Sequence, residues 1–407
     1  MGRFLIEGGV PLCGRVRVGG SKNGALPVLF ATLLSRGVSV IDNLPDIGDV
    51  SVALKILSSL GVRYRREGDR LTVDSSEAVY ASVCEELTSA LRASTYLMGA
   101  CLGAFGKCSI PTFGGCNFAP RPIDLHLSAF TALGCVIGED GIDGSRLRGG
   151  SVSLPLPSVG ATVNALLVAS SLDGHSVIKC AAGEPHIDCL IDFLRSMGAG
   201  IDRAGDTLTV RGGDLTGGYV RIPGDMIEGG SYLASGIVSG GTVTVEGLDP
   251  AELAPLLTAL SDSGVLVEQG ADSVTVCGRP RQAIELTARP YPGFPTDLQP
   301  IVAPILAIGA GGVLRDTVFR GRFGYLRELG LLGVGYELRG DGAHIYPSTP
   351  VPGNATACDL RGGMATILWA LASVGRSEIS DARIVMRGYS DLCRRLDSLG
   401  AAIKYCE

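Results

Sequence analysis

A segment rich in glycine and proline carries the sharpest chemical signal in this chain. Residues 111–125 read PTFGGCNFAPRPIDL, in which Cys116 follows Gly114 and Gly115 and lies five residues before Arg121. No regular element tolerates this density of glycine and proline, so the segment is predicted to be a loop with a thiol at an exposed tip. A nearby cation lowers the pKa of a thiol and raises its thiolate fraction. Cys116 is therefore a candidate reactive cysteine, and an ordinary surface cysteine is the alternative.

A second segment, Ser21-Lys22-Asn23-Gly24, places a lysine where a helix is predicted to begin. Free backbone N–H groups and the helix dipole attract anions at such a position. The segment does not fit the Walker A pattern, and the chain contains no G-x-G-x-x-G run, so the sequence gives no support to a dinucleotide site. Lys22 is a candidate anion-binding residue, and a solvated lysine beside a helix cap is the alternative.

The second half of the chain combines one carboxylate with several arginines. Asp297 follows the turn PYPGFPT, which is expected to hold its side chain rigidly at the start of a helix. Arg322, Arg361 and Arg387 lie at related places in the sequence, and arginine is suited to bidentate capture of carboxylate and phosphate. Together they indicate an anion site, although each alone would be interpreted as a surface arginine.

Six copies of one supersecondary unit follow one another along the chain and would position these side chains. Each copy begins with a glycine and a β-like run, continues through a helical stretch, and ends at a second glycine before another β-like run. The copies begin at Gly37, Gly106, Gly174, Gly240, Gly311 and Gly375, and their second glycines are Gly61, Gly134, Gly198, Gly264, Gly333 and Gly400. A glycine after a helix supplies the left-handed conformation that returns the chain as a strand. This repeat is too long for the common solenoids and favours a pseudo-symmetric α/β globule with three copies in each half.

The division between the halves is predicted from composition. The stretch 222–230 has Pro and Gly at its start and is interpreted as a linker. The strand-like N-terminal segments are expected to complete the second half. No charge run or low-complexity tract interrupts this plan.

Composition excludes several classes of protein. The chain has 407 residues, 46% of them hydrophobic and 19% charged, with a formal net charge of −6. This balance favours a large buried core and argues against disorder and against nucleic acid or an acidic membrane surface as a partner. The most apolar stretch, residues 300–314, is too short to span a bilayer and is predicted to be a buried helix. The first residues lack the apolar core of a signal peptide, so a cytoplasmic location is predicted.

Cysteine and histidine usage predicts no metal site. The chain has twelve cysteines without a C-x-x-C pair, and eleven of them are interpreted as buried reduced thiols, including Cys180, Cys189, Cys277 and Cys358. The four histidines, among them His126 and His186, are scattered without the spacing of metal ligands.

Taken together, the motifs resemble those of the UDP-N-acetylglucosamine 1-carboxyvinyltransferase family of enolpyruvyl transferases and, more distantly, enolpyruvylshikimate-phosphate synthase. The resemblance covers the whole chain and rests on the segments SKNGALP, LRAST, GGC…RPIDLH, PSVGAT, EPHI, FPTD, VFRGRF, DLR and RGY, in that order. It implies an α/β fold, the two-domain inside-out α/β barrel, with six pseudo-repeated βαβαββ units, three per domain. Domain 1 would comprise residues 22–223 and carry a lid loop, and domain 2 would comprise residues 1–21 plus 224–407. The active site is expected in the cleft between them.

The resemblance also implies a reaction without a cofactor. The enolpyruvyl group of phosphoenolpyruvate would be transferred to the 3-hydroxyl of UDP-N-acetylglucosamine with release of phosphate, the first committed step of peptidoglycan synthesis. Cys116 would donate a proton to the methylene carbon and form a covalent adduct, and Asp297 would be the base toward the sugar hydroxyl. Lys22, Arg121 and Arg387 would bind phosphoenolpyruvate, with help from Arg322 and Arg361. The further substrate-binding residues expected are Asn23, Arg92, Pro122, Ile123, Asp124, Leu125, Ser158, Val159, Gly160, Thr296, Val318 and Asp359.

Two alternatives stay open at this point. The acceptor could be another uridine nucleotide, such as UMP, because His186 stands in EPHI where a glutamate is common and Arg320 stands in RGRF where ENRF is frequent. The chain could also be an inactive paralogue that binds a UDP-sugar. Joint retention of the candidate catalytic residues argues against the second alternative, because a binding module needs no acid–base pair. These residues are Lys22, Cys116, Asp297 and Arg387.

Overall fold

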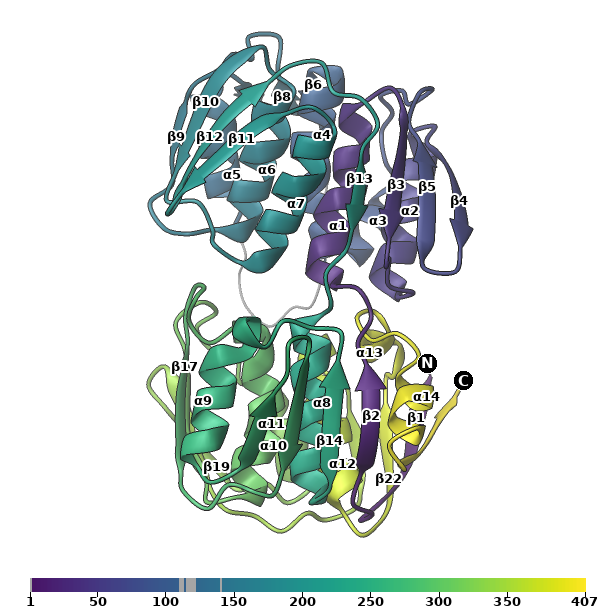
Figure 1. The fold of residues 1–407 in the computed structure, drawn as a ribbon, viewed down its shortest axis with the longest axis vertical. Helices are drawn as coiled ribbons and strands as arrows, with labels where there is room; N and C mark the ends of the chain where they lie inside the picture. The colour runs from purple at the N-terminus through teal and green to yellow at the C-terminus, as the bar shows by residue number, and fades with distance from the viewer. Residues whose placement is uncertain (1, 110–112, 115–121, 140) are drawn as a thin grey trace. The chain divides into compact units, whose positions relative to one another are not determined.

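The computed structural model of this chain describes residues 2–109, 113–114, 122–139 and 141–407. Its contacts divide the described residues into two compact units (Figure 1). We call residues 20–114 and 122–223 the middle unit, and residues 2–19 and 224–407 the terminal unit.

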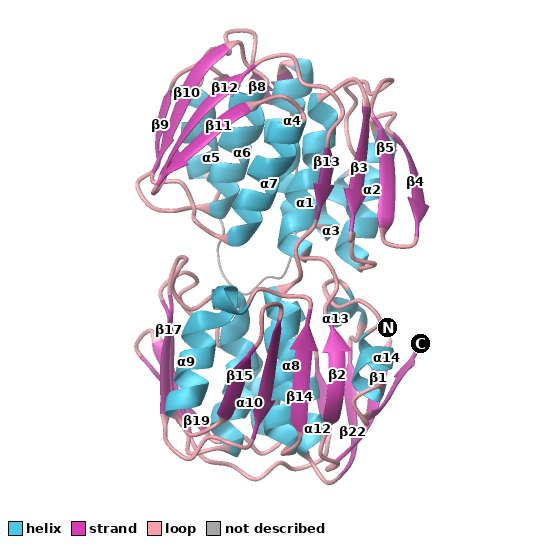
Figure 2. Ribbon diagram, in the orientation of Figure 1, coloured by secondary structure: helices cyan, strands magenta, loops and turns pink. Residues whose placement is uncertain are grey.

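The strands of the middle unit form three small sheets on the outside of its helices (Figure 2). In sheet order, the first contains β13 (Tyr219–Arg221), β3 (Val38–Asp42), β5 (Arg70–Asp74) and β4 (Arg63–Glu67). The second contains β11 (Gly200–Ala204), β12 (Thr207–Gly212), β10 (Gly174–Lys179) and β9 (Ser151–Ser153), and the third contains β6 (Lys107–Cys108), β8 (Gly141–Asp143) and β7 (Val136–Gly138). In both four-stranded sheets one edge pair is parallel, β13 with β3 and β9 with β10, and the other pairs are antiparallel.

The terminal unit repeats this plan with three four-stranded sheets. The first contains β15 (Leu266–Gln269), β16 (Ser273–Cys277), β14 (Thr242–Glu246) and β2 (Cys13–Arg17). The second contains β17 (Ile284–Ala288), β18 (Gly312–Asp316), β20 (Gly342–Ile345) and β19 (Tyr336–Arg339), and the third contains β21 (Asn354–Thr356), β22 (Gly375–Ser380), β1 (Arg3–Gly8) and β23 (Ala402–Cys406). The N-terminal strands thus pair with strands from the far end of the chain: β2 is parallel to β14, and β1 is antiparallel to β22 and β23.

The predicted repeat is present as these six sheets, one for each copy. The second glycine of every copy, from Gly61 to Gly400, has a positive φ between 84° and 116°. Only glycine adopts this conformation at little cost, so these residues let each helix end and the next strand begin. Within the described residues the strands remain six separate small sheets rather than one closed barrel.

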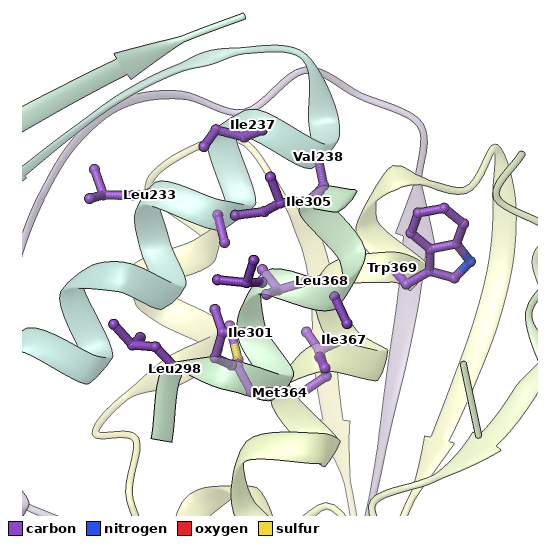
Figure 3. Close-up of a cluster of buried hydrophobic side chains, with 14 of the residues drawn as sticks. Leu233, Ile237, Val238, Leu298, Ile301, Ile305, Met364, Ile367, Leu368 and Trp369 are labelled. Atoms are coloured by element: carbon purple, nitrogen blue, oxygen red, sulfur yellow. The ribbon is translucent and has the colours of Figure 1, made fainter. Parts of the chain in front are cut away.

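Apolar helices fill the inside of each unit. In the middle unit they are α1 (Lys22–Ala31), α4 (Tyr96–Phe105) and α6 (Val159–Ser170), and in the terminal unit they are α8 (Met226–Ser239), α10 (Gln299–Ile308) and α12 (Leu360–Ala372). A helix that is apolar all round has to be buried, and every residue from Leu360 to Leu371 is buried. Ile301, Ile305 and Leu368 pack together where α8, α10 and α12 meet (Figure 3). The prediction of a buried helix in residues 300–314 is confirmed as far as Ile308.

Amphipathic helices and short 3-10 helices complete the units. In the middle unit they are η1 (Thr32–Leu34), α2 (Gly48–Ser59), α3 (Glu85–Ala90), η2 (Arg92–Thr95), α5 (Asp124–Ala132) and α7 (Pro185–Ser196). In the terminal unit they are η3 (Pro250–Leu253), α9 (Ala254–Asp262), η4 (Thr296–Leu298), α11 (Tyr325–Leu331), α13 (Arg383–Met386) and α14 (Leu392–Asp397). No helix in the described part of the chain is both long enough and apolar enough to cross a membrane.

Two crossings between the units, at residues 19–20 and 223–224, lie within the described residues. The predicted linker at 222–230 was wrong beyond Asp225. Asp225 caps α8 by accepting hydrogen bonds from Ile227 N at 2.8 Å and Glu228 N at 3.0 Å, so the helix begins at Met226. The backbone N–H of Asp225 donates to Gly19 O at 2.9 Å. On the side of the terminal unit these two crossings are therefore hydrogen bonded to each other.

Candidate active site

In the terminal unit the carboxylate of Asp297 lies between two buried arginines. Arg322 Nη1 is 2.9 Å from Asp297 Oδ1, and Arg361 Nη2 is 3.2 Å from Oδ2. The side chains of Arg322 and Arg361 are 3% and 1% exposed, whereas that of Asp297 is 26% exposed. Two neighbouring cations favour the ionised form of a carboxylate. The structure thus brings together Asp297, Arg322 and Arg361, which the sequence analysis had grouped as an anion site.

The turn that carries Asp297 is fixed by a buried acid from a neighbouring strand. Asp316, at the end of β18, accepts the hydroxyl of Thr296 at 2.6 Å and the backbone N–H of Val318 at 2.9 Å. Arg322 Nη1 also donates to Thr296 O at 3.1 Å. Burial raises the pKa of Asp316, against the lowering effect of these hydrogen bonds. Thr296 and Val318 are therefore held on either side of one carboxylate, and Val318 remains exposed.

The two other predicted site residues of the terminal unit, Asp359 and Arg387, lie at helix ends. Asp359 is the N-cap of α12 and accepts Arg361 N at 2.9 Å and Gly362 N at 3.0 Å. This cap fixes the first turn of α12, from which the Arg361 guanidinium lies 5.2 Å from the centre of the Tyr389 ring. Arg387 is partly buried at the C-terminal end of α13, two residues before Tyr389.

In the middle unit Lys22 forms an ion pair at the start of α1. Lys22 Nζ is 3.5 Å from Asp49 Oδ2 in the first turn of α2, and Asp49 is buried. Ser21 caps α1 by accepting Gly24 N at 3.3 Å. Asn23 lies in the same first turn and is partly buried. A lysine beside the N-terminus of a helix is suited to an anionic ligand, as the sequence predicted.

A second group in the middle unit contains predicted residues from three segments. Arg92 begins η2, where burial lowers the pKa of its guanidinium. Ser158 caps α6 by accepting Ala161 N at 3.4 Å, and Val159 and Gly160 form the first turn. The remaining predicted residues of the group, Pro122, Ile123, Asp124 and Leu125, lead into α5 or form its first turn.

The charge on Arg92 acts on His126 in α5, which the sequence analysis had not selected. The pKa of His126 is lowered to about 4, first by burial and then by Arg92, while Asp124 acts in the opposite direction. Asn164 in α6 lies 2.7 Å from His126 Nδ1 and was missed as well. A signal for Asn164 was available, since it is the one amide within the apolar run VGATVNALLVAS.

The remaining predictions divide into those outside the described residues and those that the structure corrects. Cys116 and Arg121 lie outside the described residues. His186 is buried in α7, and Arg320 is exposed. The expectation that eleven cysteines are buried holds for Cys101, Cys108, Cys135 and Cys189. It was wrong for Cys13, Cys84 and Cys358, which are exposed at or near strand or helix ends, and for Cys180, Cys277, Cys393 and Cys406, which are only partly buried.

Comparison with known proteins identifies the family. The family model for EPSP synthase (3-phosphoshikimate 1-carboxyvinyltransferase) matches residues 6–396. The chain is 38% identical over 412 residues to UDP-N-acetylglucosamine 1-carboxyvinyltransferase 3 of Caldanaerobacter subterraneus subsp. tengcongensis, covering 99% of each chain. It is 36% identical over 412 residues to UDP-N-acetylglucosamine 1-carboxyvinyltransferase of Halothermothrix orenii, again covering 99% of each.

Solved structures show the same fold. The enolpyruvyl transferase NikO from Streptomyces tendae aligns with a TM-score of 0.89 at 26% identity, covering 100% of this chain and 99% of that one. EPSP synthase from Acinetobacter baumannii aligns with a TM-score of 0.75 at 18% identity over the full length of both chains, which bears on the fold alone. The predicted enolpyruvyl transferase fold is therefore confirmed, and the extent of the sequence identities shows that this chain belongs to the UDP-N-acetylglucosamine 1-carboxyvinyltransferases within the EPSP synthase family.

Proposed function

We propose that this protein transfers the enolpyruvyl group of phosphoenolpyruvate to the 3-hydroxyl of UDP-N-acetylglucosamine and releases phosphate. Membership of the family supports the reaction, because the relatives carry this activity in their names. The observation that carries the chemistry is the Asp297 carboxylate held between Arg322 and Arg361. It combines a proton acceptor with cations that suit an anionic substrate.

The first proposed step is addition across the enol double bond. The methylene carbon of phosphoenolpyruvate takes a proton from the Cys116 thiol, and the sugar 3-hydroxyl adds to the neighbouring carbon while its proton passes to Asp297. That carbon becomes cationic during the addition, so a positioned acid and base are each expected to contribute about 10²–10⁴-fold. In the second step the new methyl group returns a proton to the Cys116 thiolate, the double bond re-forms and phosphate leaves.

The remaining proposed roles concern binding. Lys22, Arg121 and Arg387 would hold phosphoenolpyruvate, and Arg322 and Arg361 would assist at its phosphate and carboxylate. Arginine can contact either group with two parallel hydrogen bonds, which fixes orientation as well as charge. A reactive thiolate at Cys116 would make the protein a target of the epoxide fosfomycin, because the thiolate is the form that opens the epoxide ring.

UDP-N-acetylglucosamine is proposed to bind through residues of the middle unit together with the Asp297 turn. The residues of the middle unit proposed to contact the nucleotide sugar are Asn23, Arg92 and the segments 121–125 and 158–160. From the terminal unit, Thr296, Val318 and Asp359 are proposed as further substrate-binding residues. The α6 N-terminus with its Ser158 cap supports a diphosphate in this role, because the first N–H groups of a helix attract anions.

In the cell the proposed reaction begins peptidoglycan synthesis. It would take place in the cytoplasm and serve cell-wall biogenesis, cell shape and cell division. The proposed catalytic set draws on both predicted domains, residues 22–223 and residues 1–21 plus 224–407.

Steady-state release of phosphate from phosphoenolpyruvate tests this function, with UDP-N-acetylglucosamine and UMP compared as acceptors. We expect kcat/KM for the UDP-sugar to be at least about 10²-fold higher, because UMP lacks the groups that form several charged hydrogen bonds. Equal or better turnover of UMP would overturn the cell-wall assignment and leave enolpyruvyl transfer in place. Release of no phosphate with either acceptor would overturn the enzymatic assignment.

A further inference from the structure

A fully buried amide in the middle unit places its NH₂ group, which has two protons to donate, within hydrogen-bond distance of acceptors in three segments. Each segment contains or adjoins residues that the proposed function assigns to the UDP-sugar. Asn164 is 0% exposed and lies in the second turn of α6. Its Nδ2 lies 3.1 Å from Thr95 O in the LRAST segment and 2.7 Å from Nδ1 of His126, directly after residues 122–125. Nδ2 also lies 3.2 Å from Gly160 O in the first turn of α6.

The orientation of this amide is set by backbone groups. Gly99 N–H donates to Asn164 Oδ1 at 2.8 Å, so the oxygen has to face Gly99. Thr95 O can only accept, so the NH₂ group has to face Thr95. Thr95 and Gly99 are separated by four residues, the spacing of one helical hydrogen bond, and the Asn164 amide contacts both of them.

This orientation determines the protonation of His126. The NH₂ group of Asn164 can only donate, so Nδ1 of His126 has to accept and therefore carries no proton. The ring is then neutral with its proton on Nε2. Burial and the Arg92 charge favour this neutral form, and among the described residues Asp124 acts in the opposite direction.

Two glycines make room for the arrangement. A Cβ at Gly99 would lie 2.6 Å from Asn164 Oδ1, and a Cβ at Gly160 would lie 2.9 Å from His126 Nε2. Distances this short exclude a side chain at either position without a shift of its neighbours. The His126 ring is thus seated against the first turn of α6, the turn that Ser158 caps.

We propose that Asn164 is a positioning residue for the nucleotide acceptor, which locks His126 as the neutral Nε2–H tautomer and fixes η2, the start of α5 and the first turn of α6 against one another. The inference rests on the proposed function for the identity of the acceptor. It assigns roles to Asn164 and His126 beyond the site residues predicted from the sequence, and it places no chemical step on either residue.

The tautomer is measured directly in the wild-type protein. Only four histidines are present, so ¹⁵N-histidine labelling with long-range ¹H–¹⁵N correlation can assign His126 by comparison with His126→Gln. We expect a proton on Nε2 and none on Nδ1 from pH 8 down to pH 5. A proton on Nδ1 in the wild-type protein would overturn the proposal, whether or not the protein is an enzyme.

The nearly isosteric variant Asn164→Asp distinguishes control of the His126 tautomer from a merely structural role of Asn164. Its carboxylate can only accept, so His126 has to place a proton on Nδ1, and the negative charge favours the imidazolium. We expect Nδ1 to be protonated and the pKa of His126 to rise from about 4 by more than one unit. Retention of the Nε2–H form with an unchanged pKa would contradict the proposal.

Binding of UDP-N-acetylglucosamine, measured by calorimetry without phosphoenolpyruvate, tests the consequence for the acceptor. Asn164→Ala is expected to raise Kd at least about 10-fold, equivalent to one charged or well-placed hydrogen bond. In turnover, the same variant should raise KM for the UDP-sugar while KM for phosphoenolpyruvate changes less than about 2-fold.

The matched control is Ser39→Ala, which removes another buried side-chain acceptor of a backbone N–H, that of Gly218 at 3.1 Å, in the same unit. It should leave Kd within about 2-fold of the wild-type value. Equal weakening by both variants, or none by Asn164→Ala, would overturn the positioning role. If the wild-type protein binds the UDP-sugar but releases no phosphate from phosphoenolpyruvate, the proposed reaction fails while the role of Asn164 is still measured.

Discussion

Asp297 has two tasks at the residue scale, because the same carboxylate is the proposed base and the counter-ion of two buried guanidinium groups. We expect Asp297→Asn to abolish turnover and also to lower the free energy of unfolding by about 1–3 kcal/mol, since Arg322 and Arg361 lose a charged acceptor. Phosphate release and urea unfolding measure the two effects.

The control for Asp297→Asn is Asp74→Asn, which removes a carboxylate from the exposed pair with Arg63 at 2.9 Å. Exposed pairs contribute little, so both activity and stability should stay close to wild type. Turnover of Asp297→Asn at the wild-type rate would place the base elsewhere.

The cysteines differ enough in environment to predict where an epoxide reacts. Burial raises the pKa of Cys135 to about 11, so this thiol is a poor nucleophile. We expect fosfomycin to form one adduct, on the peptide that contains residues 114–120. Peptide mass spectrometry should show that Cys116→Ser removes the adduct and that Cys84→Ser, at an exposed position, retains it. An adduct on any other peptide would contradict the assignment.

Sequence reasoning reached individual site residues but not the contacts between them. Asp297, Arg322 and Arg361 were selected because of their chemistry. Their contacts join η4, the segment between β18 and α11, and α12, which are distant in sequence. Asn164 and His126 were missed because each alone is an ordinary buried polar residue. Their significance lies in a hydrogen bond between two helices, which no local pattern encodes.

At the scale of elements, Asp359 shows how a cap and a binding residue can be told apart. It accepts two backbone N–H groups at the start of α12, so Asp359→Ala should cost about 0.5–2 kcal/mol of stability, whereas Asp359→Asn should keep the cap. Thermal unfolding of the two variants measures this difference.

Activity of Asp359→Asn then tests its proposed contact with substrate. Loss of activity in a variant of normal stability would support the contact. Full activity in Asp359→Asn, together with lower stability in Asp359→Ala, would leave Asp359 as a cap alone.

The helices and strands of the repeat were largely predictable because a glycine marks the turn between the helix and the next strand in each copy. The turns at Gly61, Gly134 and their counterparts require a left-handed residue, and the sequence supplies one in each copy. The start of α8 was not predicted, because the glycines in MIEGG suggested a loop. They serve close packing instead: a Cβ at Gly229 would lie 2.3 Å from the Leu248 side chain.

At the scale of the whole molecule, Glu228 connects the first crossing of the chain to the core of the terminal unit. Its carboxylate accepts Gly19 N at 2.8 Å and the Tyr232 hydroxyl at 3.0 Å, and Arg395 lies 3.4 Å away. Burial raises its pKa from 4.5 to about 7, which these three partners only partly oppose.

The raised pKa makes stability depend on pH. Between about pH 4.5 and pH 7 the folded protein holds the proton more tightly than the unfolded chain, so this contribution to stability falls as the pH rises. We expect the melting temperature of the wild type to decrease from pH 5 to pH 8 more steeply than that of Glu228→Gln. Glu246→Gln, at an exposed pair with Arg15, should keep the wild-type slope, and identical slopes for all three proteins would contradict the prediction.

The pairing of β1 with β22 and β23 has a consequence for synthesis on the ribosome. Phe4 and Ile6 of β1 are 1% exposed in the finished protein, yet their partner strands are translated more than 360 residues later. At about 5–20 residues per second the nascent chain holds an unpaired apolar strand for roughly 20–70 s. The described strands of the middle unit all lie between residues 20 and 223, so each of them has its partners once residue 223 is made. On stalled ribosomes a protease should therefore cleave residues 2–8 long after the described residues of the middle unit resist it. During this interval the nascent chain most needs a chaperone.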